Sequence, residues 1–202
     1  MRRLSALLLL SGIVACADAP AEAPEEASPD SVAPTTIVDS ILPIEEEIRR
    51  FKQEVGETAS ELEGGATSRD ELVTEFVEAL SARDTAALAQ AVLNPAEFID
   101  LYFPHTVYTR PPYQMDPAAI WFQMQNNSSR GLTRALNRYG GRPLELAGYS
   151  CADQPVIEGP NRVWEECVVR LGSGSSAEAI RLFGLILETD GRFKFVTYGN
   201  NL

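Results

Sequence analysis

Residues 177–198 read AEAIRLFGLILETDGRFKFVTY, and this stretch decides the fold class. Asp190-Gly191 separates two apolar runs, and an Asp-Gly pair in that position is a strong signal for a two-residue β-hairpin. We therefore expect one long strand over 177–189 and another over 192–198. The apolar side chains of the longer strand divide between its faces, with Ile180, Leu182 and Ile186 on one and Phe183, Leu185 and Leu187 on the other.

Two further strands are expected directly before this hairpin, over 144–152 and 162–171. Consecutive strands that are joined by short turns must pair antiparallel. The helix signals all lie N-terminal to these strands. The sequence therefore predicts an α+β fold, in which N-terminal helices pack on a curved, C-terminal, four-stranded antiparallel sheet.

Helix starts are marked by residues that cap a helix N-terminus. Ser68 and Glu71 match the capping box, in which each side chain bonds the other's backbone N–H. Asp84 is the expected cap of the next helix, and Asn94-Pro95 and Asp116-Pro117 place a cap before a proline at the first helical position.

Two finer expectations concern the middle of the chain. Residues His105–Thr109 are expected to form a short strand. The helix that starts at Asp116 should run to Gly140-Gly141, with a break near 127–131, because Ser and Gly are weak helix formers.

The stretch EFVEALSARD at 75–84, together with the order of the expected elements, resembles the NTF2-like (cystatin-like, SnoaL-like) superfamily over about residues 68–202. The chain differs in an extra helix near 95–103 and in lacking an obvious first hairpin. The resemblance implies a bent sheet that wraps a long helix and forms a cone with a pocket. It also implies a possible homodimer. The superfamily contains both enzymes and binding modules, so the fold decides no activity.

The N-terminus resembles that of a bacterial lipoprotein. Two arginines precede a short apolar run that ends in Ile13-Val14-Ala15-Cys16, which is similar to a lipobox. The resemblance implies a signal peptide over 1–15, acylation of Cys16 (with palmitate among the chains), and a place in the cell envelope, outside the cytoplasm, at the inner or the outer membrane. An ordinary secretory signal is the alternative.

A tether is expected over 16–36, because this segment is rich in Pro, Ala and Glu and has no aromatic residue. Residues 17–66 hold thirteen acidic and three basic residues, and the whole chain has a net charge of −12. Nucleic acid is therefore a poor partner. One His and three Cys leave few ligands for zinc, and we expect no metal or cofactor.

The segment 37–66 should contain an amphipathic helix, over about 43–56, followed by a hinge at Gly64-Gly65. Its apolar residues recur at spacings of three and four: Ile37, Ile41, Ile44, Ile48, Phe51 and Val55. The folded domain is expected to start near residue 67. Such a stripe either packs on this domain or forms a short coiled coil with another chain.

Cys151 and Cys167 are expected to form a disulfide, because a hairpin that turns near Glu158-Gly159-Pro160 places them opposite each other. A secreted location permits such a bond. Two buried free thiols are the alternative.

Catalytic candidates are few. His105 and Asp100, with Tyr102 and Tyr108, are the weak candidates for an acid–base site, and a hydrogen-bonded aromatic cluster is the alternative. The arginines between 130 and 142 are candidates for holding an anion or an acidic partner: Arg130, Arg134, Arg138 and Arg142. Arginines that only complement a helix C-terminus are the other possibility.

Three hypotheses for function follow. The leading one is a membrane-tethered lipoprotein whose domain binds a small ligand or an envelope protein without catalysis. The second is a pocket enzyme that uses His105 or Asp100 as a base. The third is a structural protein of the envelope, assembled through the helix of 37–66 and the arginines.

Overall fold

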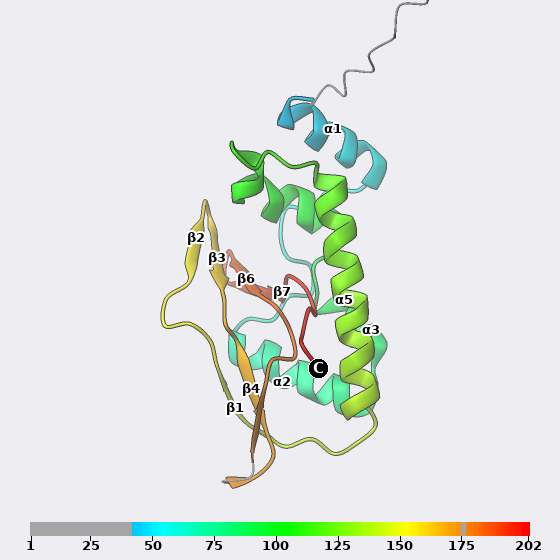
Figure 1. Ribbon diagram of the computed structural model, residues 1–202, viewed down its shortest axis with the longest axis vertical. Helices are drawn as coiled ribbons and strands as arrows, with labels where there is room; N and C mark the ends of the chain where they lie inside the picture. Colours follow the sequence, from blue (N-terminus) through cyan, green and yellow to red (C-terminus); the bar gives the residue numbers. More distant parts are fainter. Residues whose placement is uncertain (1–41, 175–176) are drawn as a thin grey trace, which may run out of the picture. The chain divides into compact units, whose positions relative to one another are not determined.

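The computed structural model describes residues 42–174 and 177–202, which belong to one compact unit. The expected signal peptide, Cys16 and the tether lie outside the described residues. The helices are α1 (Ile44–Val55), α2 (Arg69–Ala82), α3 (Thr85–Gln90), α4 (Pro95–Glu97) and α5 (Pro117–Tyr139), with short helical turns over Phe98–Tyr102, Phe103–His105 and Val107–Thr109. The strands are β1 (Leu146–Ser150), β2 (Val156–Glu158), β3 (Asn161–Trp164), β4 (Val168–Leu171), β5 (Glu178–Ile180), β6 (Ile186–Thr189) and β7 (Arg192–Phe195) (Figure 1).

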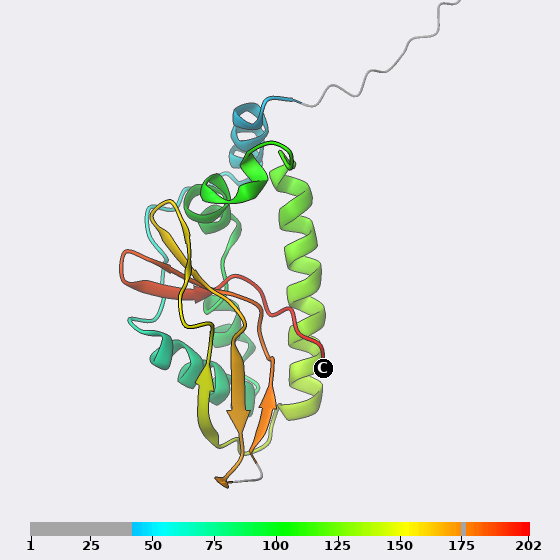
Figure 2. The same cartoon turned by 60° about the vertical axis from the view of Figure 1, so that its left-hand side comes forward.

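The α+β class is confirmed, but the strands form two antiparallel sheets instead of one sheet of four. One sheet has the order β1-β4-β5 and the other β2-β3-β6-β7. The two long strands that we expected are each divided, so that β3 and β6 pair in one sheet and β4 and β5 in the other. Figure 2 shows β1, β4 and β5 side by side, with the red strand β7 running across their direction.

One backbone conformation and one close contact mark where the long strands divide. Glu166, between β3 and β4, has a φ of 54°, which an extended ladder does not accept. Gly184, between β5 and β6, lies so close to Thr197 that a Cβ there would be 2.9 Å from its Oγ1. Each strand therefore leaves one sheet at a bend and enters the other.

The predicted helix caps are confirmed, although the capping box expected at Ser68 is only half formed, because the Glu71 carboxylate accepts from the N–H and hydroxyl of Thr67. Ser68 accepts a hydrogen bond from the backbone N–H of Glu71, and Asp84 from those of Ala86 and Ala87. Asn94 forms a complete capping box with Glu97, and Asp116 accepts from the N–H of Ala118.

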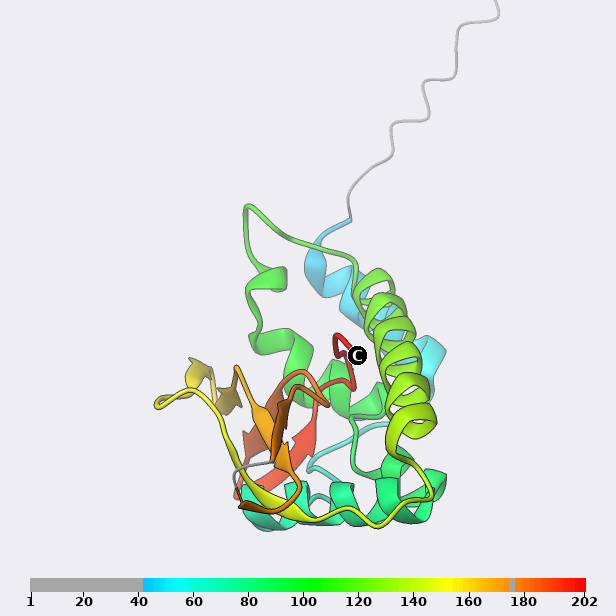
Figure 3. The ribbon, with the colours of Figure 1, turned by 60° about the horizontal axis from the view of Figure 1, so that its bottom comes forward.

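Helix α5 is continuous, so the expected break near 127–131 is wrong. Its weak helix formers accommodate the C-terminal segment, which lies between α5 and the sheets (Figure 3). The Ser128 hydroxyl accepts from the N–H of Tyr198 at 3.1 Å, and Asn200 donates to the carbonyl of Gly131 at 2.9 Å. A Cβ at Gly131 would lie 1.7 Å from the Tyr198 carbonyl oxygen. The serine and the glycine thus permit a close approach of two backbones.

The strand expected over His105–Thr109 is also wrong. The segment forms two successive 3₁₀ turns, with Thr106 at the junction. Both the N–H and the hydroxyl of Thr106 donate to the carbonyl of Phe103, which closes the first turn locally. The backbone groups that a strand would use for pairing are therefore occupied.

Helix α1 packs on its own domain, as the first alternative predicted. Phe51 is buried and meets Phe98 edge to face, with ring centres 5.9 Å apart. Ile44, Ile48 and Val55 contact the same cluster, whereas Ile37 and Ile41 lie outside the described residues. Gly64-Gly65, expected to be a hinge, precedes Ala66, which is buried and exchanges two backbone hydrogen bonds with Phe193 of β7.

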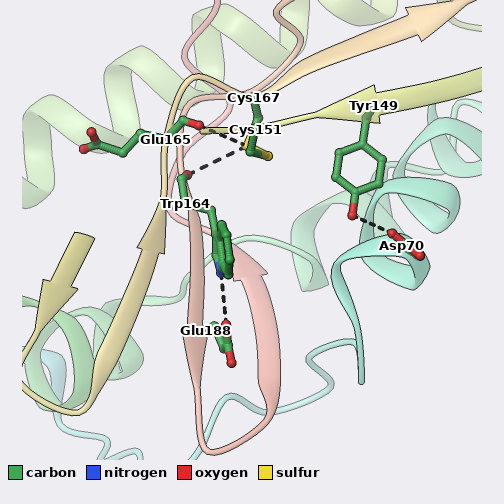
Figure 4. Close-up of a disulfide and its surroundings, with 7 residues drawn as sticks. All are labelled: Asp70, Tyr149, Cys151, Trp164, Glu165, Cys167 and Glu188. Carbon is green, nitrogen blue, oxygen red and sulfur yellow. Dashed lines mark hydrogen bonds between the residues drawn. A yellow bond between two sulfur atoms is a disulfide. The ribbon is translucent and has the colours of Figure 1, made fainter. Parts of the chain in front are cut away.

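The disulfide between Cys151 and Cys167 is confirmed (Figure 4). Ser150 pairs with Val168 in the β1–β4 ladder, so the two cysteines are the next opposed positions. Beside them, Tyr149 donates to Asp70 at 2.6 Å, which joins β1 to α2. Burial, and then this bond to a carboxylate, raise the pKa of Tyr149 to about 12.

Replacing Gly131 with alanine tests the contact between α5 and the C-terminal segment. Alanine normally stabilises a helix, but here its methyl group must displace the Tyr198 carbonyl, so we expect a loss of about 2 kcal/mol in the free energy of unfolding. Urea denaturation measures it. Ser129→Ala, at an exposed position of the same helix, is the control and should not destabilise the protein. A Gly131→Ala variant as stable as the control would contradict the described packing.

Candidate functional site

A cavity of about 210 Å³ lies between α5 and the segments that connect the strands. Helix α5 supplies Ile120 and Met124, and the residues beside β6 and β7 supply Leu185 and Val196. The hydrogen-bonding groups of the lining are two phenols, two amides and one hydroxyl, from Tyr102, Tyr108, Gln123, Asn127 and Thr197. This mixture of apolar walls and a few polar groups is typical of a small-molecule site.

The structure separates the four acid–base candidates. Tyr102 and Tyr108 line the cavity, and neither Asp100 nor His105 belongs to its lining. Asp100 forms an ion pair with Lys52 of α1 at 2.6 Å and accepts the N–H of Ala59 at 2.8 Å. Its carboxylate thus holds α1 and the segment after it, which is a structural role.

His105 lies against the turn between β2 and β3. Gly159 in this turn has a φ of 61°, and a Cβ there would be 2.6 Å from Nδ1 of His105. At the start of β3, directly after this turn, the Asn161 amide donates to the carbonyl of Leu101 at 2.7 Å. The turn therefore packs against the segment that carries Tyr102, His105 and Tyr108.

Glu158, which the sequence analysis did not single out, is the titratable group that this packing brings to the tyrosines. Its Oε2 is buried, and so is the Oδ1 of Asn161; neither has a hydrogen-bond partner among the described residues. Glu158 and Asn161 are directly opposed in the β2–β3 ladder. Side chains at opposed positions lie on the same face of a hairpin. The turn thus presents two oxygen acceptors that lack a donor.

The surroundings of Glu158 favour its protonated form. Burial raises the pKa of Glu158, the nearby Glu165 carboxylate raises it further, and Arg110 opposes them. Burial also raises the pKa of Tyr102, and Glu158, Tyr108 and Glu165 add to the shift. The Tyr102 phenol therefore stays a neutral hydrogen-bond donor at the edge of the cavity.

The arginine candidates do not form a single anion site. Arg134 donates to the side chain and the carbonyl of Asn200, at 3.1 and 2.6 Å, and so fastens the C-terminal segment. Arg138 pairs with Glu178 at 2.9 Å. In the part of the chain that the structure describes, the side chains of Arg130 and Arg142 have no hydrogen-bond or ion-pair partner and are exposed.

The surroundings of the disulfide are a further polar cluster. Arg69 stacks over the Trp164 ring at 3.6 Å. Figure 4 shows the Trp164 indole donating to Glu188, at 3.0 Å. These contacts join the strands to one another and to α2, so we assign the cluster a structural role.

No protein-family model, curated protein or solved structure matches the chain. Over residues 42–174 and 177–202, the structure contains no group of three or more His, Cys, Asp or Glu side chains that could hold a metal ion. Within the same ranges no helix is long and apolar enough to cross a membrane.

Glu158→Gln tests whether the buried oxygens of Glu158 and Asn161 lack hydrogen-bond donors. Because the native state raises the pKa of Glu158, it binds the proton more tightly than the unfolded chain, so this group's contribution to stability is lost as the pH rises through the raised value. A glutamine amide stays neutral and can donate to Asn161. We expect the variant to be more stable than the parent by about 1 kcal/mol at pH 8, with a smaller difference at pH 4. Urea denaturation at both pH values measures this, and a difference that does not change with pH would contradict it.

Proposed function

We propose that this protein is a lipid-anchored protein of the bacterial cell envelope whose NTF2-like domain binds a small ligand without catalysis. The observation that carries the proposal is the cavity of about 210 Å³, with its apolar walls and neutral polar groups. The anchor rests on the lipobox-like Ile13-Val14-Ala15-Cys16. A cleavable signal also agrees with the disulfide, since such bonds persist outside the cytoplasm.

The arrangement of the elements supports the NTF2-like assignment. Helices α2 and α3 precede the long helix α5, and the antiparallel strands follow it. The strands bend from one sheet into the other, and α5 lies beside them (Figure 3). The cavity lies where the resemblance places the pocket of the cone, between the long helix and the bent strands.

The lining defines the class of ligand. Its volume is below the range of about 300–1,000 Å³ that is usual for drug-sized ligands, so the occupant is small. No lining residue is charged, and the lining includes two aromatic rings. The ligand that fits is a neutral aromatic or alicyclic molecule with one or two polar groups, which meet Gln123, Asn127 or Thr197.

Acid–base catalysis is the second candidate function, and Glu158 is the observation that favours it. A carboxyl group with a raised pKa beside Tyr102 provides a general acid near the cavity. It would replace His105 and Asp100 in the enzyme hypothesis. Envelope assembly has less support, because α1 and two of the arginines are engaged within the chain. A homodimer stays a prediction from the resemblance.

One experiment tests both the lipid anchor and ligand binding in the cavity. The chain, expressed in bacteria and purified from the membrane fraction, should carry acyl chains on Cys16 by mass spectrometry. Cys16→Ser should release it into the soluble fraction. On the released protein, 4-fluorophenol serves as the probe, and its binding is followed by ¹⁹F NMR. Native mass spectrometry of the same sample shows any bound molecule and the oligomeric state.

The matched variants are Asn127→Trp and Asn137→Trp, both at exposed positions of α5. Only Asn127 lines the cavity. We expect Asn127→Trp to weaken 4-fluorophenol binding at least tenfold and Asn137→Trp to leave it unchanged. Equal binding by both variants would contradict the cavity, and an unacylated parent chain would contradict the anchor.

A further inference from the structure

A second concavity lies on a different part of the unit, between α2, α3 and the residues before α2. Its volume is about 490 Å³. Buried apolar side chains form its floor, from Leu72, Phe76, Ala79 and Leu88. Glu75, Glu78 and Asp84 are exposed in its lining. It shares no lining residue with the cavity beside α5. We call it the α2–α3 groove.

The groove has an uncompensated negative charge. Its lining contains no Lys, Arg or His. Glu75 and Glu78 have no hydrogen bond or ion pair with any residue that the structure describes. The neighbouring Arg83 donates to the carbonyl of Gly140, at the end of α5, and Arg192 donates to the carbonyl of Gly65. Neither cation reaches the two glutamates.

The same charge decides between possible occupants. The chain's own N-terminal segment and a second copy of the chain are both acidic, since 17–66 hold thirteen acidic against three basic residues and the chain carries −12. Like charges across an interface oppose association. An occupant with positive charge is the complementary one.

The shape of the groove indicates that the occupant is an amphipathic helix. Five alanines line it besides the larger floor residues, namely Ala66, Ala79, Ala82, Ala87 and Ala91, so a partner can approach closely. An amphipathic helix docks by laying its apolar face in such a groove. Lys and Arg can cover apolar surface with their stems while the charged ends reach carboxylates at the edge.

We propose that the α2–α3 groove docks a cationic amphipathic helix of a partner protein. The apolar side chains of the helix contact the accessible alanines of the groove, Ala82, Ala87 and Ala91, and its Lys or Arg side chains pair with Glu75 and Glu78. The proposal is independent of the anchor and of the cavity beside α5.

The test uses the full chain and a capped synthetic peptide of leucine and lysine with helical spacing of the leucines. A peptide of identical composition in scrambled order is its control. Isothermal titration calorimetry gives the affinities, and the backbone amides that shift in two-dimensional NMR give the location. We expect the amphipathic peptide to bind more tightly than the scrambled one and to shift amides within residues 64–91.

Paired substitutions separate the groove from overall charge attraction. Glu75→Gln with Glu78→Gln should weaken binding five- to tenfold. Glu45→Gln with Glu54→Gln removes the same charge from exposed positions of α1 and should leave binding unchanged. All four positions are exposed, so circular dichroism should show both double variants folded. Equal losses in the two variants, equal binding of the two peptides, or shifts confined to other elements would overturn the proposal.

Discussion

The buried ion pair between Glu97 and Lys194 is the interaction on which the arrangement of the elements depends. The two side chains are 0% and 3% exposed, and Nζ lies 2.7 Å from Oε1. Glu97 also accepts the N–H of Asn94, as part of the capping box of α4, and the N–H of Glu63. One carboxylate thus joins the start of α4, the strand β7 and the segment after α1. The helical turn that follows α4 carries Tyr102, so the same carboxylate helps to position one wall of the cavity.

The sequence predicted those features that depend on neighbouring residues. Ser68, Asp84, Asn94 and Asp116 cap their helices because a cap needs only the N–H groups of the next turn. The disulfide followed from the symmetry of one hairpin. The prediction of two undivided long strands was wrong because a bend can depend on contact with another segment, as between Gly184 and Thr197. The expected break in α5 was wrong for the same reason, since Gly131 permits close contact with the backbone of the C-terminal segment.

The site was only partly visible in the sequence. Tyr102 and Tyr108 do line the cavity, but Asp100 is taken by Lys52 of α1, an element that the sequence assigned to a separate segment. Glu158 gave no signal beyond its position in a turn, because its chemistry arises from burial against the segment that carries Tyr102. The described surface therefore offers two separate environments. One is a small, neutral cavity beside α5, and the other is an acidic groove over α2 and α3.

A double-mutant cycle on the buried ion pair tests the central claim most directly. Lys194→Met and Glu97→Gln are compared singly and together by urea denaturation. Each single change leaves a buried polar group without its partner, so we predict that Lys194→Met costs about 3–5 kcal/mol and that the double variant loses clearly less than the sum of the single losses. Losses below about 1 kcal/mol that simply add would contradict the account, because the ion pair would then not hold α4, β7 and the segment after α1 together.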